Sequence, residues 1–273
     1  TGGTDIRRDV RTLQIGVEIV VGTPGRLVDL GKRKCLDLTK IEIVVLDEAD
    51  EMLDMGFREE LEAVLADIPS AHRTLMFSAT LPPGIRLLAK RFQQNPLELD
   101  PRTGAPKAPH ADIRHVAHLF GGGERTSALI NVLLFADDPR AVVFCRTRES
   151  VGDLHRQLQQ AGFRVDSISG ERAQEERTRA LEALRSGRVR VLVATDVASR
   201  GLDLPDLGLV IHVDLPENAE VLTHRSGRTG RAGKKGVNVV LVERGAQRRA
   251  ERLFREAGLK LPWTPIPTAE TVA

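Results

Sequence analysis

Short apolar runs alternate with longer amphipathic stretches along most of this 273-residue chain, and no other feature constrains its fold as strongly. An apolar run of roughly four to eight residues between polar positions indicates a buried strand, and an apolar period of about 3.6 residues indicates a helix. Strands that alternate with helices favour a parallel sheet covered by helices on both faces. The sequence therefore predicts an α/β fold.

The apolar runs before residue 100 predict too few strands to complete a doubly wound domain. Fully buried strands are expected over residues 17–21, 41–46 and 74–78, and helices over 58–68 and 84–92. Residues 1–99 are therefore interpreted as an incomplete α/β domain with apolar edges that favour aggregation.

A proline-rich segment separates this region from a second one. Residues 100–112, DPRTGAPKAPHAD, hold three prolines and show no apolar period, which is typical of a linker. Beyond it, strands are predicted over 113–120, 141–145, 163–168, 189–194, 207–213 and 236–242, and helices over 148–161, 174–186 and 245–257. Residues 113–260 are interpreted as a complete second domain, followed by a tail over 261–273.

Composition excludes several classes of protein. No run approaches the ~18 consecutive apolar residues of a membrane span, and no basic flank followed by an apolar stretch marks a secretory signal. A net charge of +2 excludes a polycation that coats nucleic acid without selection. Aromatic residues make up 3% of the chain, with no Tyr, so nucleic-acid contacts are expected to run through phosphate and sugar rather than through stacked bases.

The two cysteines, Cys35 and Cys145, are too few and too far apart for a metal knuckle or a disulfide framework. Cys145 ends an apolar run and is expected to be a small buried hydrophobe. A reducing, cytoplasmic location fits this cysteine content. Because the chain lacks an initiator Met, we expect it to begin inside a longer protein.

The segment VVLDEADEML places Asp47, Glu48, Ala49 and Asp50 directly after the apolar run 41–46. In an open parallel sheet, ligands bind outside the carboxyl ends of the strands. An Asp at that edge can hold Mg²⁺ through water against nucleotide phosphates, and a neighbouring Glu can activate an attacking water. Alternatively, the acids begin a helix whose dipole favours negative charge. The four residues by themselves leave both interpretations open.

Three further predicted strands also end in polar residues or lead into a helix start. After 17–21, Thr23 is a candidate N-cap with Pro24 at the first helical position, which makes either a phosphate seat beside Arg26 or an ordinary cap. The strand 74–78 ends in Ser78-Ala-Thr80, which alone indicates little. The segment VLVATDVASRGLD ends in a polar set: Thr195, Asp196, Ser199, Arg200 and Asp203.

The segment HRSGRTGRAG, residues 224–233, places Arg225, Arg228 and Arg231 three residues apart. This spacing suits a phosphate clamp, including arginines that reach a transferred phosphoryl group, although a solvated basic surface has the same composition. Two glycines within one turn are costly in a helix unless another part of the molecule must approach closely.

Taken in order, these motifs resemble the DEAD-box family of ATP-dependent RNA helicases. The resemblance is carried by TPGR, DEAD, SAT, VVFCRT, AQEER, ATDVASRGLD and HRSGRTGR. It extends from the paired glycines Gly2 and Gly3 to about residue 257, and Asp50 in place of His separates the chain from DEAH relatives. The family implies two RecA-like parallel-sheet domains, here with the first incomplete, that close over ATP and single-stranded RNA.

The resemblance also implies roles for individual residues. Asp47 would hold Mg²⁺ through water, Glu48 would activate water, and Arg228 and Arg231 would reach the γ-phosphate. Coupling between ATP state and domain closure would involve Asp50, Ser78, Thr80 and His224. Asp196 and Asp203 would bind ATP. RNA would be held by Gly2, Gly3, Thr23, Arg26, Arg146, Gln174, Arg177, Thr195 and Arg200. A monomer is expected, with no membrane partner.

One family element is missing from the sequence. No G-x-x-x-x-G-K-[ST] phosphate loop occurs, and the nearest candidate, GGGERTS at 121–127, lacks the Lys and is interpreted as a turn and helix start. The family places this loop upstream of Gly2, so we expect the full-length parent to be an ATPase and this piece to be inactive alone. Two alternatives stay open: a non-catalytic RNA-binding fragment built mainly on residues 111–260, and a DNA helicase of a related superfamily, which the spelling of the motifs disfavours.

Overall fold

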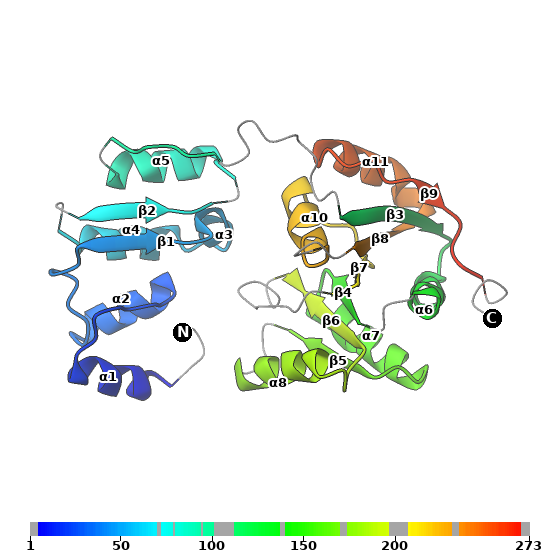
Figure 1. The fold of residues 1–273 in the computed structure, drawn as a ribbon, viewed down its shortest axis with the longest axis horizontal. Helices are drawn as coiled ribbons and strands as arrows, with labels where there is room; N and C mark the ends of the chain where they lie inside the picture. Colours follow the sequence, from blue (N-terminus) through cyan, green and yellow to red (C-terminus); the bar gives the residue numbers. More distant parts are fainter. Residues whose placement is uncertain are drawn as a thin grey trace. The chain divides into compact units, whose positions relative to one another are not determined.

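The protein forms two compact units, residues 1–105 and 106–273, in a computed structural model (Figure 1). The structure describes residues 5–69, 72–78, 80–93, 95–100, 112–136, 140–169, 174–196, 207–230 and 235–268. Most of the predicted linker, 100–112, lies outside the described residues. Each unit is a parallel α/β structure, which confirms the predicted fold class; the exact domain limits stay a prediction.

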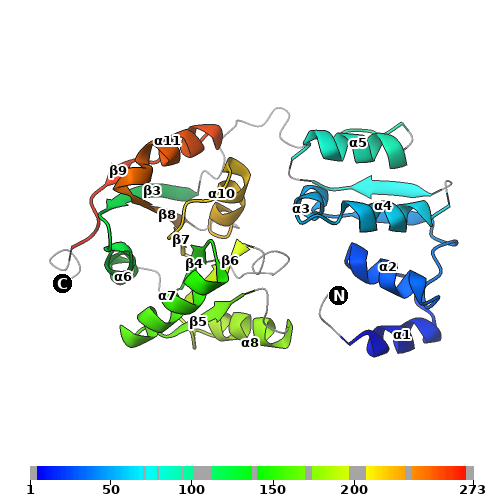
Figure 2. The ribbon, with the colours of Figure 1, turned by 180° about the vertical axis from the view of Figure 1, so that it is seen from behind.

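The first unit has two strands among its described residues. Its elements are α1 Ile6–Ile15, α2 Pro24–Lys32, β1 Ile43–Leu46, α3 Ala49–Asp54, α4 Arg58–Ala66, β2 Arg73–Met76 and α5 Pro83–Phe92. β1 and β2 pair in parallel, with Ile43 opposite Arg73. Figure 2 shows α4 and α5 beside the two strands. Buried residues of these helices, among them Leu61 and Ile85, pack with Leu46 in one apolar cluster.

The predicted strand over 17–21 is wrong. Those residues form neither helix nor strand, and Ile19 and Val21 are 80% and 83% exposed. An apolar run becomes a strand only where a neighbouring strand satisfies its backbone N–H and C=O groups, and no described strand lies beside this one. Full burial of the next strand is also wrong, because Ile43 and Val45, on the opposite face from Leu46, are 59% and 55% exposed.

The described residues of the second unit form a seven-stranded parallel sheet in the order β5-β6-β4-β7-β8-β3-β9. Its elements are β3 Ile113–Phe120, α6 Arg125–Phe135, β4 Ala141–Cys145, α7 Arg148–Gln160, β5 Val165–Ile168, α8 Gln174–Arg185, β6 Val191–Thr195, β7 Leu209–His212, α10 Ala219–Ser226, β8 Gly236–Glu243, η1 Arg244–Ala246, α11 Gln247–Glu256 and β9 Trp263–Thr264. The six predicted strands are confirmed, with shifts of at most two residues at their ends. The short β9, in the tail, was not predicted.

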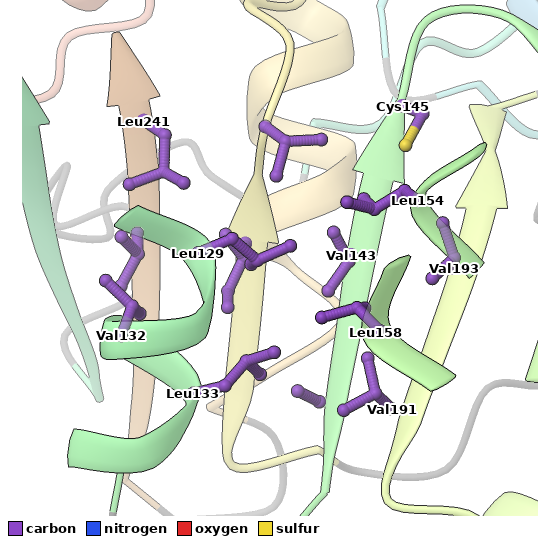
Figure 3. Packing of buried hydrophobic residues seen from close by; sticks show 14 of the residues in the cluster. Leu129, Val132, Leu133, Val143, Cys145, Leu154, Leu158, Val191, Val193 and Leu241 are labelled. Atoms are coloured by element: carbon purple, nitrogen blue, oxygen red, sulfur yellow. The ribbon is translucent and has the colours of Figure 1, made fainter. Parts of the chain in front are cut away.

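Alternate residues of these strands build apolar cores on the two faces of the sheet. Residues of α6 and α7 cover the face that carries Val143 and Val193 (Figure 3). Residues of α8, α10 and α11 cover the other face, which carries Phe144 and Val240. Cys145 is fully buried at the end of β4, and burial raises the pKa of its thiol to about 12, as expected for a residue that serves as a small hydrophobe.

The structure also bears on the glycine-rich segment 121–127 and on membrane-spanning helices. The segment GGGERTS is a turn followed by the start of α6, which confirms that interpretation, and the Gly121 amide donates to Glu124 Oε2 at 2.8 Å. Within the described ranges, no helix is both long enough and apolar enough to cross a lipid bilayer.

Candidate functional site

The acidic segment lies in a sharp turn at the carboxyl end of β1. Asp47 and Glu48 are exposed, and the Glu48 amide donates to Asp47 Oδ1 at 3.0 Å. Glu48 has a left-handed φ of 50°, and α3 begins at the next residue. The two interpretations of the sequence therefore apply to different residues: Asp47 and Glu48 lie at the sheet edge, whereas Asp50 and Glu51 lie in the first helical turn.

The carboxylate of Asp50 joins this turn to the segment after β2. Asp50 is 2% exposed, and its Oδ2 accepts hydrogen bonds from both the amide and the hydroxyl of Thr80 at 2.8 Å. Ser78 Oγ accepts from the Asp50 amide at 3.3 Å and donates to the Thr80 carbonyl at 2.7 Å. Three of the four residues predicted to couple ATP state to closure are thus in direct contact; the fourth, His224, is half-buried on α10 of the second unit.

The charge of Asp50 is stabilised within this network. Burial acts to raise the pKa of Asp50, but hydrogen bonds with Thr80, Ser78 and the Glu51 amide together outweigh it and hold the pKa below its ordinary value. The folded form therefore favours the ionised carboxylate more than the unfolded chain does. The network accordingly contributes stability above the unfolded-state pKa of about 4 and loses it as the pH falls toward the folded-state value.

Asp50→Asn is expected to weaken the pH dependence of unfolding in the acid range. Asn has a single side-chain oxygen, so it cannot accept from Thr80 and Glu51 as the carboxylate does. Urea unfolding at a series of pH values from about 7 to 3 should show lower stability at neutral pH and a smaller loss below about pH 4. Asp54→Asn, an exposed acid on the same helix, is the control. An unchanged acid slope in Asp50→Asn would contradict the assignment.

The first turn of α2 occupies the position predicted for a phosphate seat. Thr23 is the N-cap and Pro24 the first helical residue, as predicted, although the Thr23 hydroxyl makes no capping hydrogen bond. The Arg26 guanidinium forms an ion pair with Asp9 of α1 at 3.0 Å, and its side chain is 13% exposed. Arg26 is thus fixed against α1, which the sequence did not indicate.

Asp196, directly after β6, forms a bidentate ion pair with Arg225 of α10. The two N–H···O distances are 2.5 and 2.6 Å, and Arg225 is 4% exposed. Reading Arg225, Arg228 and Arg231 as one clamp therefore needs correction, because Arg225 is buried and already neutralised. Arg228 is half-buried just beyond the end of α10, and Arg231 lies outside the described residues.

Gly230, in the segment HRSGRTGRAG, allows the close approach that the sequence analysis gave as a reason for glycine there. Gly230 has a left-handed φ of 68°, and a Cβ atom there would lie 2.4 Å from Cγ1 of Ile113. The segment after α10 must therefore pass closely over the start of β3, which a larger residue would prevent.

Sequence reasoning missed Asp214, which follows β7. Its Oδ1 accepts from the Arg125 guanidinium and its Oδ2 from the amide of Arg146, each at 2.9 Å. This contact fixes the backbone at the end of β4, where the exposed Arg146 side chain is a predicted RNA ligand. The signal was present in the sequence, since Asp214 is one more polar residue just after an apolar strand.

Only some of the remaining residues predicted to bind RNA or ATP lie among the described residues. Thr195 is buried at the end of β6, and Arg177 on α8 is half-buried, where burial lowers the pKa of its guanidinium. Gly2, Gly3, Arg200, Asp203 and the side chain of Gln174 lie outside the described residues. The described residues contain no group of three or more His, Cys, Asp or Glu side chains that could enclose a metal ion.

Two family models match the two units separately. The model described as DEAD/DEAH box helicase matches residues 1–88, and the model described as Helicase conserved C-terminal domain matches residues 124–233. The crystal structure of a DEAD box protein from the hyperthermophile Methanococcus jannaschii is 34% identical, with a TM-score of 0.53; the match covers 97% of this chain and 70% of that one. This chain belongs to the DEAD-box RNA helicase family.

Other DEAD-box proteins resemble the chain over nearly its whole length. The DEAD-box ATP-dependent RNA helicase CshA of Bacillus cereus is 39% identical over 98% of this chain and 51% of its own length. The structure of Dbp5 from S. cerevisiae bound to RNA and ADP BeF3 is 29% identical, with a TM-score of 0.80 over 92% of this chain and 66% of that one. The chain thus spans about half the length of curated relatives such as CshA.

Proposed function

We propose that this DEAD-box protein is an ATP-dependent RNA helicase, in which RNA-stimulated ATP hydrolysis is coupled to local unwinding of short duplexes. The single observation that carries the proposal is the buried Asp50–Thr80 contact, made across 30 positions of sequence. It ties the turn that bears Asp47 and Glu48 to the segment after the neighbouring strand. A change of bound nucleotide at Asp47 and Glu48 can therefore alter the position of the segment that holds Thr80.

The acids suit phosphoryl transfer to water. Asp47 is an exposed carboxylate at a sheet edge, which fits Mg²⁺, since this ion keeps several of its waters and is commonly held by one or two carboxylates and the phosphates. Bound there, Mg²⁺ would neutralise charge that develops on the phosphates. Glu48 would orient the attacking water and accept its proton, Asp196 and Asp203 would contact the nucleotide, and Arg228 and Arg231 would stabilise the transferred group.

RNA contact is proposed to use backbone phosphate and ribose with little base readout. The low aromatic content supports this choice, because base stacking needs aromatic platforms and only 3% of this sequence is aromatic. Arg146 lies at the carboxyl edge of the second sheet, exposed and with its backbone fixed by Asp214. The full proposed set is Gly2, Gly3, Thr23, Arg26, Arg146, Gln174, Arg177, Thr195 and Arg200.

The 273 residues by themselves are proposed not to hydrolyse ATP. They contain no G-x-x-x-x-G-K-[ST] sequence, whose amides and Lys cradle the phosphates in enzymes of this kind. A specific observation also favours RNA binding without catalysis for this piece: among the described residues, the second unit has a seven-stranded sheet, whereas the first has two paired strands and exposes Ile43 and Val45.

Phosphate release and strand separation test the proposed function directly. The full-length protein should release phosphate from ATP faster when single-stranded RNA is added, and it should separate a short RNA duplex only in the presence of ATP. The 273-residue chain should bind RNA and do neither. Hydrolysis without RNA dependence, or stimulation by DNA equal to that by RNA, would contradict the proposal.

A further inference from the structure

A network of polar side chains, which we call the polar network, crosses three neighbouring strands of the second sheet: His212 and Asn238 are buried, and His115 is half-buried. His212 of β7 and Asn238 of β8 are both 0% exposed, and His212 Nε2 lies 2.7 Å from Asn238 Oδ1. Asn238 Nδ2 lies 3.1 Å from Nδ1 of His115, its partner in the register of β3 and β8. Buried polar groups in a sheet core are costly unless each finds a partner, so their presence in this core calls for a physical reason.

The last member of this polar network is Arg225, which lies against the same face of the sheet. Its Nη1 is 3.4 Å from His212 Nδ1 and donates to the Asp214 carbonyl at 3.2 Å. Its Nε and Nη2 bind the two oxygens of Asp196, and the guanidinium carbon is 5.1 Å from the centre of the Phe144 ring. The guanidinium is therefore contacted by a carboxylate, a carbonyl, an imidazole and an aromatic ring.

Arg225 fixes the direction of each hydrogen bond in the polar network. An arginine can only donate, so Nδ1 of His212 must accept and Nε2 must carry the proton. Nε2–H then donates to Oδ1 of Asn238, which leaves Nδ2 to donate to Nδ1 of His115. A second proton on His212 would point at the guanidinium. Burial and the charge of Arg225 accordingly lower the pKa of His212 well below its usual value.

We propose that His212 and Asn238 are positioning residues for Arg225, which they hold in the orientation that presents Asp196 at the carboxyl edge of the sheet. The inference rests on the proposed function only in taking Asp196 as a nucleotide contact. If His212 and Asn238 served packing alone, apolar residues of similar volume would fill the same space without any need to pair buried ring nitrogens and amide atoms. Instead, the hydrogen bonds run in one direction, from His115 on β3 to the ion pair between Arg225 and Asp196.

The first test measures the protonation of His212 and needs no nucleotide. Nitrogen-15 NMR of the histidine side chains in the 273-residue chain should show His212 as the neutral Nε2–H form from about pH 8 to pH 5, the range in which an ordinary His gains its charge. Asn238→Leu should remove this fixed pattern. An Nδ1–H form, or protonation of His212 within that range, would overturn the proposed chain of hydrogen bonds whatever the protein's activity.

The second test asks whether the polar network affects the affinity for nucleotide. In the full-length protein, Asn238→Leu should raise the KM for ATP about threefold to tenfold, the effect expected from loss of one or two hydrogen bonds, with a smaller change in kcat. Asn238→Asp keeps an acceptor for His212 and should restore most of the affinity. His118→Gln is the control, since His118 is buried in the same sheet but contacts Thr264 instead; it should lower the melting temperature and leave the KM unchanged.

The outcomes separate this inference from the proposed function. If Asp196→Ala raises the KM but Asn238→Leu does not, the positioning role is wrong. An equal rise in Asn238→Leu and His118→Gln would also overturn it, because the effect would then be general destabilisation. If Asp196→Ala itself leaves the KM unchanged, the nucleotide contact assigned to Asp196 fails, and the NMR result alone decides whether Arg225 is held as described.

Discussion

Glu48→Gln is expected to lower the RNA-stimulated rate of ATP hydrolysis by about 10²- to 10⁴-fold in the full-length protein, the range attributed to a positioned general base. Glu48 lies just after β1 in a left-handed conformation, and its side chain is exposed rather than used in the first turn of α3. Gln keeps the size and the hydrogen-bonding reach of Glu but cannot accept a proton from water at neutral pH. RNA binding should therefore persist while phosphate release fails.

The comparison is made by phosphate release at saturating ATP and single-stranded RNA, with RNA affinity measured in parallel. Glu59→Gln serves as the matched control, because Glu59 is an exposed acid in the first turn of the nearby helix α4. It should retain the parental rate. Full activity in Glu48→Gln would show that another group activates the water, and an equal loss in both variants would point to folding rather than catalysis.

Local pattern predicted the second unit well because its strands are buried on both faces. β4 is AVVFC in sequence and buried at all five positions, so an apolar run and a strand coincide there. The same rule failed over 17–21, VEIVV, where a mostly apolar run has no paired strand among the described residues. The apolar pattern records what a segment can bury, whereas strand formation also requires a partner elsewhere in the chain.

The candidate site was predictable in its residue types and less so in its contacts. Polar residues that follow apolar strands identified Asp47, Asp50 and Asp196, because the edge of a parallel sheet gathers them. Which carboxylate pairs with which partner depends on tertiary distance, so the contact of Asp50 with Thr80 and that of Asp196 with Arg225 could not be read from spacing. Equal spacing of the three arginines in HRSGRTGR concealed that one of them is buried.

Arg228→Ala is expected to have the largest effect of all, a loss of about 10³- to 10⁵-fold in the rate of RNA-stimulated hydrolysis, as found when an arginine that stabilises a transferred phosphoryl group is removed. Arg228 follows Gly227, the C-cap of α10. Its amide donates to the Arg225 carbonyl at 3.1 Å, and its carbonyl accepts from the Leu207 amide at 3.4 Å. Because the backbone is held on both sides, removal of the side chain should leave the fold intact.

Two control variants make this result interpretable. Arg248→Ala removes an exposed arginine from α11 and should leave hydrolysis unchanged. Arg228→Lys keeps the charge but loses the planar fork that binds two phosphate oxygens at once, so it should recover little of the rate. Thermal unfolding of all three proteins checks that each is folded. Near-parental hydrolysis in Arg228→Ala, with RNA affinity also unchanged, would mean that the transferred phosphate is neutralised without this residue and that the catalytic role assigned to it is wrong.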